Sequence, residues 1–78
     1  MERTRQGVEQ SREFGARVRV HRLAAGLSQE QLAHESGVHR TYVGHVERGE
    51  VNPTLYSIVR IAGALEVDPA ELVRGLTA

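Results

Sequence analysis

Hydrophobic residues recur every three or four positions along most of this chain, the spacing that puts one apolar face on an α-helix. Five such segments follow one another, at about residues 11–25, 28–36, 38–48, 54–65 and 68–76. No segment has the pattern of a strand. The sequence therefore predicts an all-α fold of five helices, in which residues 1–10 form a flexible N-terminal arm and residues 11–78 form one domain.

The boundaries between the predicted helices carry helix-capping residues. Ser28 with Gln31 three places later has the form of a capping box. Thr54 caps the fourth segment, and Asp68 followed by Pro69 begins the last one. The connections between segments are short, so consecutive helices are expected to pack as neighbours around a single thin core. The residues expected to fill that core are Phe14, Val18, Leu27, Leu32, Val38, Val43, Val46, Ile58, Ile61 and Leu65.

Composition limits what such a domain could bind or catalyse. The 78 residues contain ten basic and ten acidic side chains, so any attraction to nucleic acid must be local rather than a property of the whole molecule. There is no cysteine, which excludes a disulfide, a thiolate zinc site and a cysteine nucleophile. The apolar stretches are far shorter than the roughly 20 residues that span a bilayer. We expect a cytoplasmic protein that makes no contact with membranes.

An enzyme is not expected. The motifs HExxH, GxSxG, GxGxxG and the P-loop are all missing, and the four histidines are dispersed without the spacing of metal ligands. The sequence therefore predicts no catalytic residue, no metal, no cofactor and no small-molecule ligand.

The second and third predicted helices, joined by a turn at Gly37, have the spacing of a helix-turn-helix, a motif that can seat its second helix in the major groove of DNA. The third helix turns its valines inward, which leaves a polar and basic outer face of Arg40, Thr41, Gly44, His45 and Arg48. Arginine can fork onto guanine, and threonine can offer a hydroxyl and a methyl group to a base edge. An ordinary solvated helix face is the alternative.

Several separate sequence pieces carry a family resemblance. They are Val18-Arg19-x-x-Arg22, Gly26-Leu27-Ser28-Gln29-Glu30-x-Leu32-Ala33, Gly37-Val38-x-Arg40-Thr41-Tyr42-Val43, Glu47-Arg48-Gly49 and Asn52-Pro53-Thr54-Leu55. In this order and spacing, over about residues 14–73, the chain resembles the Cro and phage-repressor class of helix-turn-helix proteins, the XRE family. Among short members of that family it is similar to restriction–modification controller proteins.

The resemblance implies roles for particular residues. Base edges would be contacted by Arg40, Thr41 and His45, and Tyr42 would contact a phosphate or a base step. The remaining DNA contacts would come from Ser28, Gln29, Arg48 and Asn52, although Ser28 could equally be only a helix cap. The resemblance also implies a largely buried salt bridge between Arg22 and Glu47.

A helix-turn-helix monomer covers one half-site, so a homodimer is expected on an operator whose half-sites lie about 34 Å apart. Some apolar residues exceed what the monomer core needs, and these are the candidates for the dimer interface: Tyr56, Val59, Leu72, Val73 and Leu76. Core packing of the same residues is the alternative.

The resulting hypothesis is a sequence-specific regulator of transcription that binds double-stranded DNA as a homodimer and is associated with the nucleoid in the cytoplasm. Two alternatives remain. One is an antitoxin-type regulator that also binds a toxin partner, and the other is a helical module that binds proteins. The salt dependence of binding distinguishes the protein-binding module from the DNA-binding hypotheses. Binding through phosphates weakens steeply as the salt concentration rises, whereas binding in an apolar groove barely responds.

Overall fold

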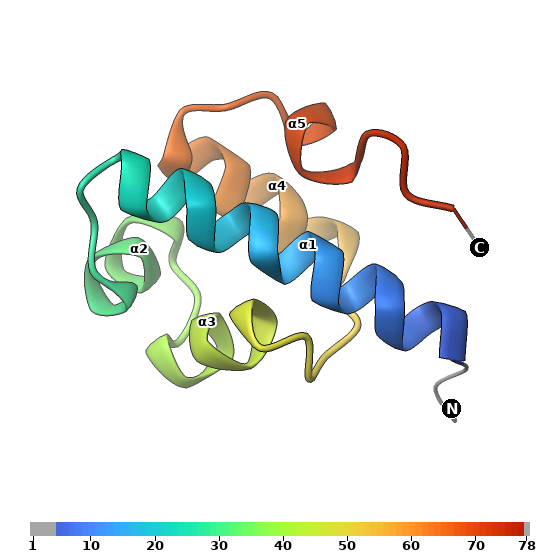
Figure 1. Ribbon diagram of the computed structural model, residues 1–78. Coiled ribbons are helices and arrows are strands. Elements are labelled where there is room, and N and C mark those ends of the chain that lie inside the picture. The colour runs from blue at the N-terminus through green and yellow to red at the C-terminus, as the bar shows by residue number, and fades with distance from the viewer. Residues whose placement is uncertain (1–4, 78) are drawn as a thin grey trace.

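The computed structural model describes residues 5–77, and this part of the chain consists of five helices without a strand (Figure 1). The helices are α1 (Arg5–Ala24), α2 (Gln29–Ser36), α3 (Arg40–Glu47), α4 (Leu55–Leu65) and α5 (Pro69–Val73). The long α1 packs against α3, α4 and α5, while α2 packs against α3 and α4. The expected all-α, five-helix class is confirmed. None of these helices combines the length and the apolar character needed to cross a bilayer.

The first helix begins earlier than the sequence pattern indicates. Residues 5–10, expected to belong to a flexible arm, are helical. The Gln10 side-chain amide donates a hydrogen bond to the carbonyl oxygen of Thr77, and Gln10 lines a small groove together with Phe14 and Leu76. The C-terminal segment therefore lies beside this part of α1 and gives it a partner. The rest of the expected arm, residues 1–4, lies outside the described residues.

The core lies between α1 and the other four helices. Its buried apolar residues are Phe14, Val18, Leu32, Ala33, Val43, Val46, Ile61, Ala62, Leu65 and Leu72. Three residues expected in the core, Leu27, Val38 and Ile58, are partly buried and pack against it.

Leu72 corrects one expectation. Its side chain is fully buried, at 0% exposure, so it cannot belong to a dimer interface on the surface of this domain. The reason is the direction of α5, which contacts both α1 and α4 and turns Leu72 into the core. Leu76, also expected at that interface, is partly buried and packs against the same core.

Side-chain caps fix where α2 and α3 begin. The Ser28 hydroxyl oxygen accepts a hydrogen bond from the Gln31 backbone N–H at 3.0 Å, and the Gln31 side chain accepts one from the Ser28 N–H at 2.7 Å. This reciprocal pair is a complete capping box. At α3 the cap is His39, whose Nδ1 atom accepts from the Thr41 N–H at 3.0 Å. Each helix of the pair therefore starts at a defined residue.

The turn between α2 and α3 is held from α4. Gly37 ends α2 in the left-handed conformation, with φ 77°, which glycine adopts without steric cost. Arg60 of α4 donates through Nε to the carbonyl oxygen of Ser36 at 2.7 Å, and its guanidinium covers Gly37. The turn is thus packed against the core and not left as a loose loop.

Candidate nucleic-acid interface

A buried ion pair joins the helix-turn-helix to α1. Arg22 donates through Nε to Glu47 Oε2 at 2.6 Å and through Nη2 to Glu47 Oε1 at 3.0 Å, and the two side chains are only 8% and 3% exposed. Arg22 also donates to the carbonyl oxygen of Leu27 at 2.9 Å, and the Gln29 amide donates to Glu47 at 3.1 Å. The hydrogen bond to Glu47 raises the pKa of Arg22 against the opposing effect of burial. The pair implied by the resemblance is present, and it fixes the start of α2 relative to the end of α3.

The outer face of α3 gathers most of the residues expected to contact DNA. Arg40, Thr41 and Arg48 are exposed, and Tyr42 and His45 are half-buried. All five lie on α3 or at its C-cap, Arg48.

Gly44 was expected on the same outer face, but it is buried. A Cβ atom there would lie 3.1 Å from Nη1 of Arg48. The guanidinium of Arg48 therefore folds back along α3 and occupies the space that a larger side chain would fill. Gly44 thus leaves space for the side chain of Arg48, the C-cap of the same helix.

The basic side chains of this face are paired with two carboxylates, Glu30 and Glu50, which are not among the expected contact residues. Arg40 Nη1 lies 2.6 Å from Glu30 Oε1, and both side chains are largely exposed. His45 Nδ1 and Arg48 Nε both contact Oε1 of Glu50, at 2.8 Å and 3.0 Å. The hydrogen bond from His45, and then that from Arg48, lowers the pKa of the Glu50 carboxyl.

No sequence signal marks Glu30 and Glu50 as partners. The Arg40–Glu30 pair joins α3 to α2 and depends on the angle between them, whereas Glu50 meets His45 and Arg48 across the turn that ends α3. Exposed ion pairs are weak in water, so these contribute little to the stability of the fold.

The start of α2 supplies two more of the expected DNA contacts. Ser28 is exposed, and its hydroxyl, which accepts from Gln31, keeps its own proton to donate. Gln29 uses its amide nitrogen toward Glu47, and a primary amide has a second N–H.

Asn52, the last of the expected contacts, is exposed and lines a groove with Ser11 and Phe14 of α1. Within residues 5–77 it forms no hydrogen bond with the outer face of α3. The structure therefore brings seven of the eight expected residues to α3, its C-cap and the start of α2, and places Asn52 beside α1.

The described side chains form no group of three or more histidine, aspartate and glutamate residues that could hold a metal ion. The face is built from hydrogen-bond donors and acceptors. Such a surface can recognise a polar, anionic partner by shape and hydrogen bonding.

The helix order and this exposed face define a class of protein. A helix-turn-helix family model matches residues 18–72, well over half of the chain, and the chain belongs to this family. Proteins of this family are DNA-binding regulators of transcription and not enzymes. The family therefore confirms the expected role in regulating transcription and the expectation that the protein is not an enzyme.

Particular relatives narrow the class. Control protein C.BamHI of Bacillus amyloliquefaciens is 46% identical over 61 residues, which span 77% of this chain and 75% of its own length. The restriction-modification controller protein C.AhdI from Aeromonas hydrophila is 50% identical in its crystal structure, with a TM-score of 0.80 over 82% of this chain and 97% of that one. The P22 c2 repressor, solved in complex with a synthetic operator, is 27% identical with a TM-score of 0.73, covering 80% and 94% of the two chains. The resemblance to the phage-repressor class and to controller proteins is confirmed.

Proposed function

We propose that this protein is a restriction–modification controller that binds a two-fold DNA operator as a homodimer in the cytoplasm and thereby regulates transcription. One observation carries the proposal. The outer face of α3 presents Arg40, Thr41, His45 and Arg48 together, on a helix whose end is fixed by the buried Arg22–Glu47 pair. The similarity to control proteins supports the assignment.

In this proposal α3 lies in the major groove and its side chains read base edges. Arg40 uses Nη1 for Glu30 and keeps its other N–H groups, which suffice for a forked pair with O6 and N7 of guanine. Thr41, next along the helix, can contact an adjacent base through its hydroxyl or its methyl group. These contacts supply the sequence preference.

Other residues hold the protein in register on the DNA backbone. The N-terminus of α2 carries unpaired backbone N–H groups and a partial positive charge, so a phosphate is favoured there. Ser28 and Gln29 donate beside it, while Arg48, Asn52 and the hydroxyl of Tyr42 serve further phosphates. The ring of Tyr42 packs against the core, which restricts the position of its hydroxyl group relative to α3. Phosphate contacts of this kind position the protein without reading sequence.

A second copy of the chain is proposed to cover the exposed face of α4. Leu55, Tyr56 and Val59 are 76%, 68% and 50% exposed, an unusual concentration of large apolar side chains on one short helix. Val73 of α5 adds a further exposed apolar side chain, and Leu76 borders it. A two-fold interface uses the same patch on both subunits, so one apolar face is enough to build it.

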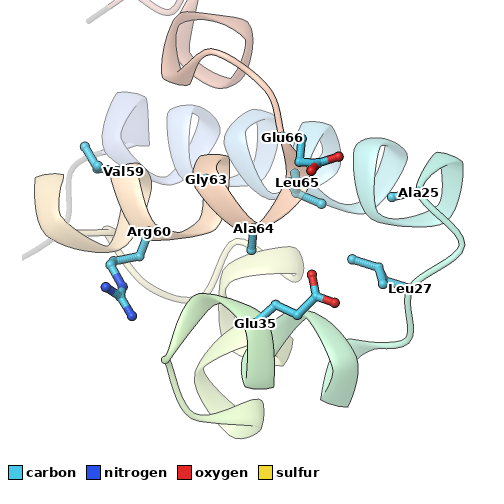
Figure 2. A pocket seen from close by; sticks show the side chains of 9 residues that line it. All are labelled: Ala25, Leu27, Glu35, Val59, Arg60, Gly63, Ala64, Leu65 and Glu66. Carbon is cyan, nitrogen blue, oxygen red and sulfur yellow. The ribbon is translucent and has the colours of Figure 1, made fainter.

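An open groove continues from this face and gives the partner a place to insert side chains (Figure 2). Val59, Arg60 and Gly63 line it from α4, and Leu27 and Glu35 line its opposite wall. A Cβ atom at Gly63 would meet nothing within 4 Å, so the groove is unobstructed at its middle.

Selection of the purified protein on a random duplex DNA library at about 150 mM salt tests the proposal, because specific complexes survive physiological salt whereas phosphate-only binding weakens. We expect enrichment of a two-fold site with half-sites about 34 Å apart. Thr41→Ala should relax the preference at one position of each half-site, whereas Val20→Ala, a change on the solvent side of α1, should leave the site unchanged. Retention of random sequence by the unaltered protein would overturn the proposal.

The controller assignment has its own test. Footprinting on the DNA in front of the protein's own gene should protect the selected site, and methyltransferase and endonuclease reading frames should lie next to that gene. A protected site beside the gene for a small protein that binds this chain would instead identify an antitoxin.

A further inference from the structure

The carboxylate of Glu50 determines which ring nitrogen of His45 carries the proton. His45 Nδ1 lies 2.8 Å from Oε1 of Glu50. A carboxylate can only accept hydrogen bonds, so at this distance Nδ1 must be the donor. A glutamate carboxyl is ionised at neutral pH, and the contacts with His45 and then Arg48 lower the pKa of Glu50 further.

The other ring nitrogen is open to a ligand. Within residues 5–77 no hydrogen bond to Nε2 of His45 is formed, and Nε2 is not among buried polar atoms that lack a partner. It therefore has surface exposed to solvent, on a residue of the outer face of α3. In a neutral imidazole whose Nδ1 holds the proton, Nε2 is a hydrogen-bond acceptor.

We propose that Glu50 is a positioning residue that sets base specificity through His45, by presenting Nε2 as an acceptor to a base that carries an amino group in the major groove. The bases that offer such a donor are cytosine, through N4, and adenine, through N6. Guanine and thymine present only acceptors at the corresponding place and are disfavoured. This inference rests on the proposed function, in which α3 lies in the major groove.

Arg48 makes the arrangement switchable. Its Nη2 atom lies 3.5 Å from His45 Nδ1, too far for a good hydrogen bond while Glu50 holds both side chains. Guanidinium nitrogens can only donate. Once the carboxylate is removed, the group nearest to Nδ1 is this donor, which favours an unprotonated Nδ1. The proton then moves to Nε2, and His45 becomes a donor suited to guanine or thymine.

Two substitutions of Glu50 distinguish its effect on the tautomer of His45 from the effect of its negative charge. Glu50→Ala and Glu50→Gln both remove one negative charge. Only Glu50→Gln keeps an oxygen that can accept from Arg48 Nε and from His45 Nδ1, as Oε1 of Glu50 does. The glutamine variant should therefore behave like the unaltered protein, and the alanine variant should not.

The first measurement is made without DNA. Nitrogen NMR of the imidazole at about pH 8, where histidine side chains are neutral, reports the tautomer directly. We expect the Nδ1–H form in the unaltered protein and in Glu50→Gln, and a shift to Nε2–H in Glu50→Ala. An Nε2–H form in the unaltered protein, or the same shift in both variants, would overturn the inference whatever the protein binds.

The second measurement is base selection from a random duplex library. The unaltered protein and Glu50→Gln should prefer an amino-bearing base at one position of each half-site by roughly 2- to 12-fold, the effect of one hydrogen bond. Glu50→Ala should prefer guanine or thymine there, with the other positions unchanged. His45→Ala should lose the preference, and adding Glu50→Ala to it should change nothing further.

The two measurements fail in distinguishable ways. If the tautomer shifts as expected but the unaltered protein enriches no sequence, the proposed function is wrong. If the protein enriches an operator and Glu50→Ala retains the same base at every position, the function stands and the role of Glu50 is wrong.

Discussion

Gly15 of α1 lies directly against the backbone of α3, so that a Cβ atom at this position would overlap the carbonyl oxygen of Val46 and press on that of Glu47. These neighbours are backbone atoms that cannot rotate away. Gly15→Ala should therefore force α1 and α3 apart and lower the free energy of unfolding by about 1–3 kcal/mol, the usual cost of overpacking. Urea unfolding followed by circular dichroism measures the loss.

A second helical glycine provides the matched control. Gly63 of α4 has open space where a Cβ atom would stand. Gly63→Ala should raise stability by roughly 0.5–1 kcal/mol, because alanine loses less backbone entropy in a helix. Equal gains from the two substitutions would show that helix propensity, and not the α1–α3 approach, controls the result.

The buried ion pair makes a second prediction. Glu47→Ala should cost about 3–5 kcal/mol, since it leaves the Arg22 guanidinium buried without its carboxylate. Thermal and urea unfolding check this value. A loss under about 1 kcal/mol would mean that the pair is solvated in solution.

Replacing both partners tests whether the loss comes from the orphaned charge. An Arg22→Met, Glu47→Leu double variant fills the same space with apolar atoms, and such exchanges are often close to neutral. We expect it to recover most of the stability lost in Glu47→Ala. It should still bind DNA less well, because Gln29 at the start of α2 loses its acceptor.

Self-association should depend on Val59 and not on Leu72. Val59→Glu places a charge on the exposed face of α4 and should abolish the dimer in sedimentation while leaving monomer stability nearly unchanged. Val20→Glu, at a valine of α1 that is 64% exposed against 50% for Val59, is the control and should leave the dimer intact. Leu72→Ala should instead lower stability by roughly 2–5 kcal/mol, the cost of emptying a buried leucine site. A dimer that survives Val59→Glu would move the interface elsewhere.

The carboxyl of Glu50 should titrate below the ordinary range of a glutamate. Because its pKa is lowered in the folded protein, the contacts with His45 and Arg48 stabilise the fold at pH values above that range. Their contribution is lost as the pH falls through the lowered pKa. Carbon NMR of the side chain measures the midpoint, which His45→Ala and Arg48→Ala should each move upward. Identical midpoints in the three proteins would show that the contacts do not persist in solution.

Local signals made much of this fold predictable. The capping box of Ser28 and Gln31, the cap at Thr54 and the Asp68–Pro69 start of the last helix each act within a few residues, so the sequence shows them directly. The helix-turn-helix and most of the core follow from these boundaries and the helical spacing. The exposed face of α3 follows from the same periodicity.

What the sequence did not show depends on contacts between distant residues. The helix extends back to Arg5, and within this extension the Gln10 side chain contacts Thr77 of the C-terminal segment, a partner 67 positions away that no local pattern reveals. Leu72 is buried because α5 folds back toward α1, an angle that no local pattern encodes. The partnership of Glu30 with Arg40 likewise exists only once α2 and α3 are set at their mutual angle.

These carboxylates also bear on how the protein finds its site in a cell. The net charge of the protein is zero, and the cationic side chains of α3 form ion pairs with Glu30 and Glu50. Little electrostatic potential therefore extends beyond the surface. We therefore expect non-specific DNA, which attracts proteins mainly through charge, to retain few copies. If the proposed function holds, we expect most molecules to remain unbound, in a number that follows synthesis. Occupancy of the operator would then follow the concentration of the protein directly, because non-specific sites on the chromosome would not compete for it.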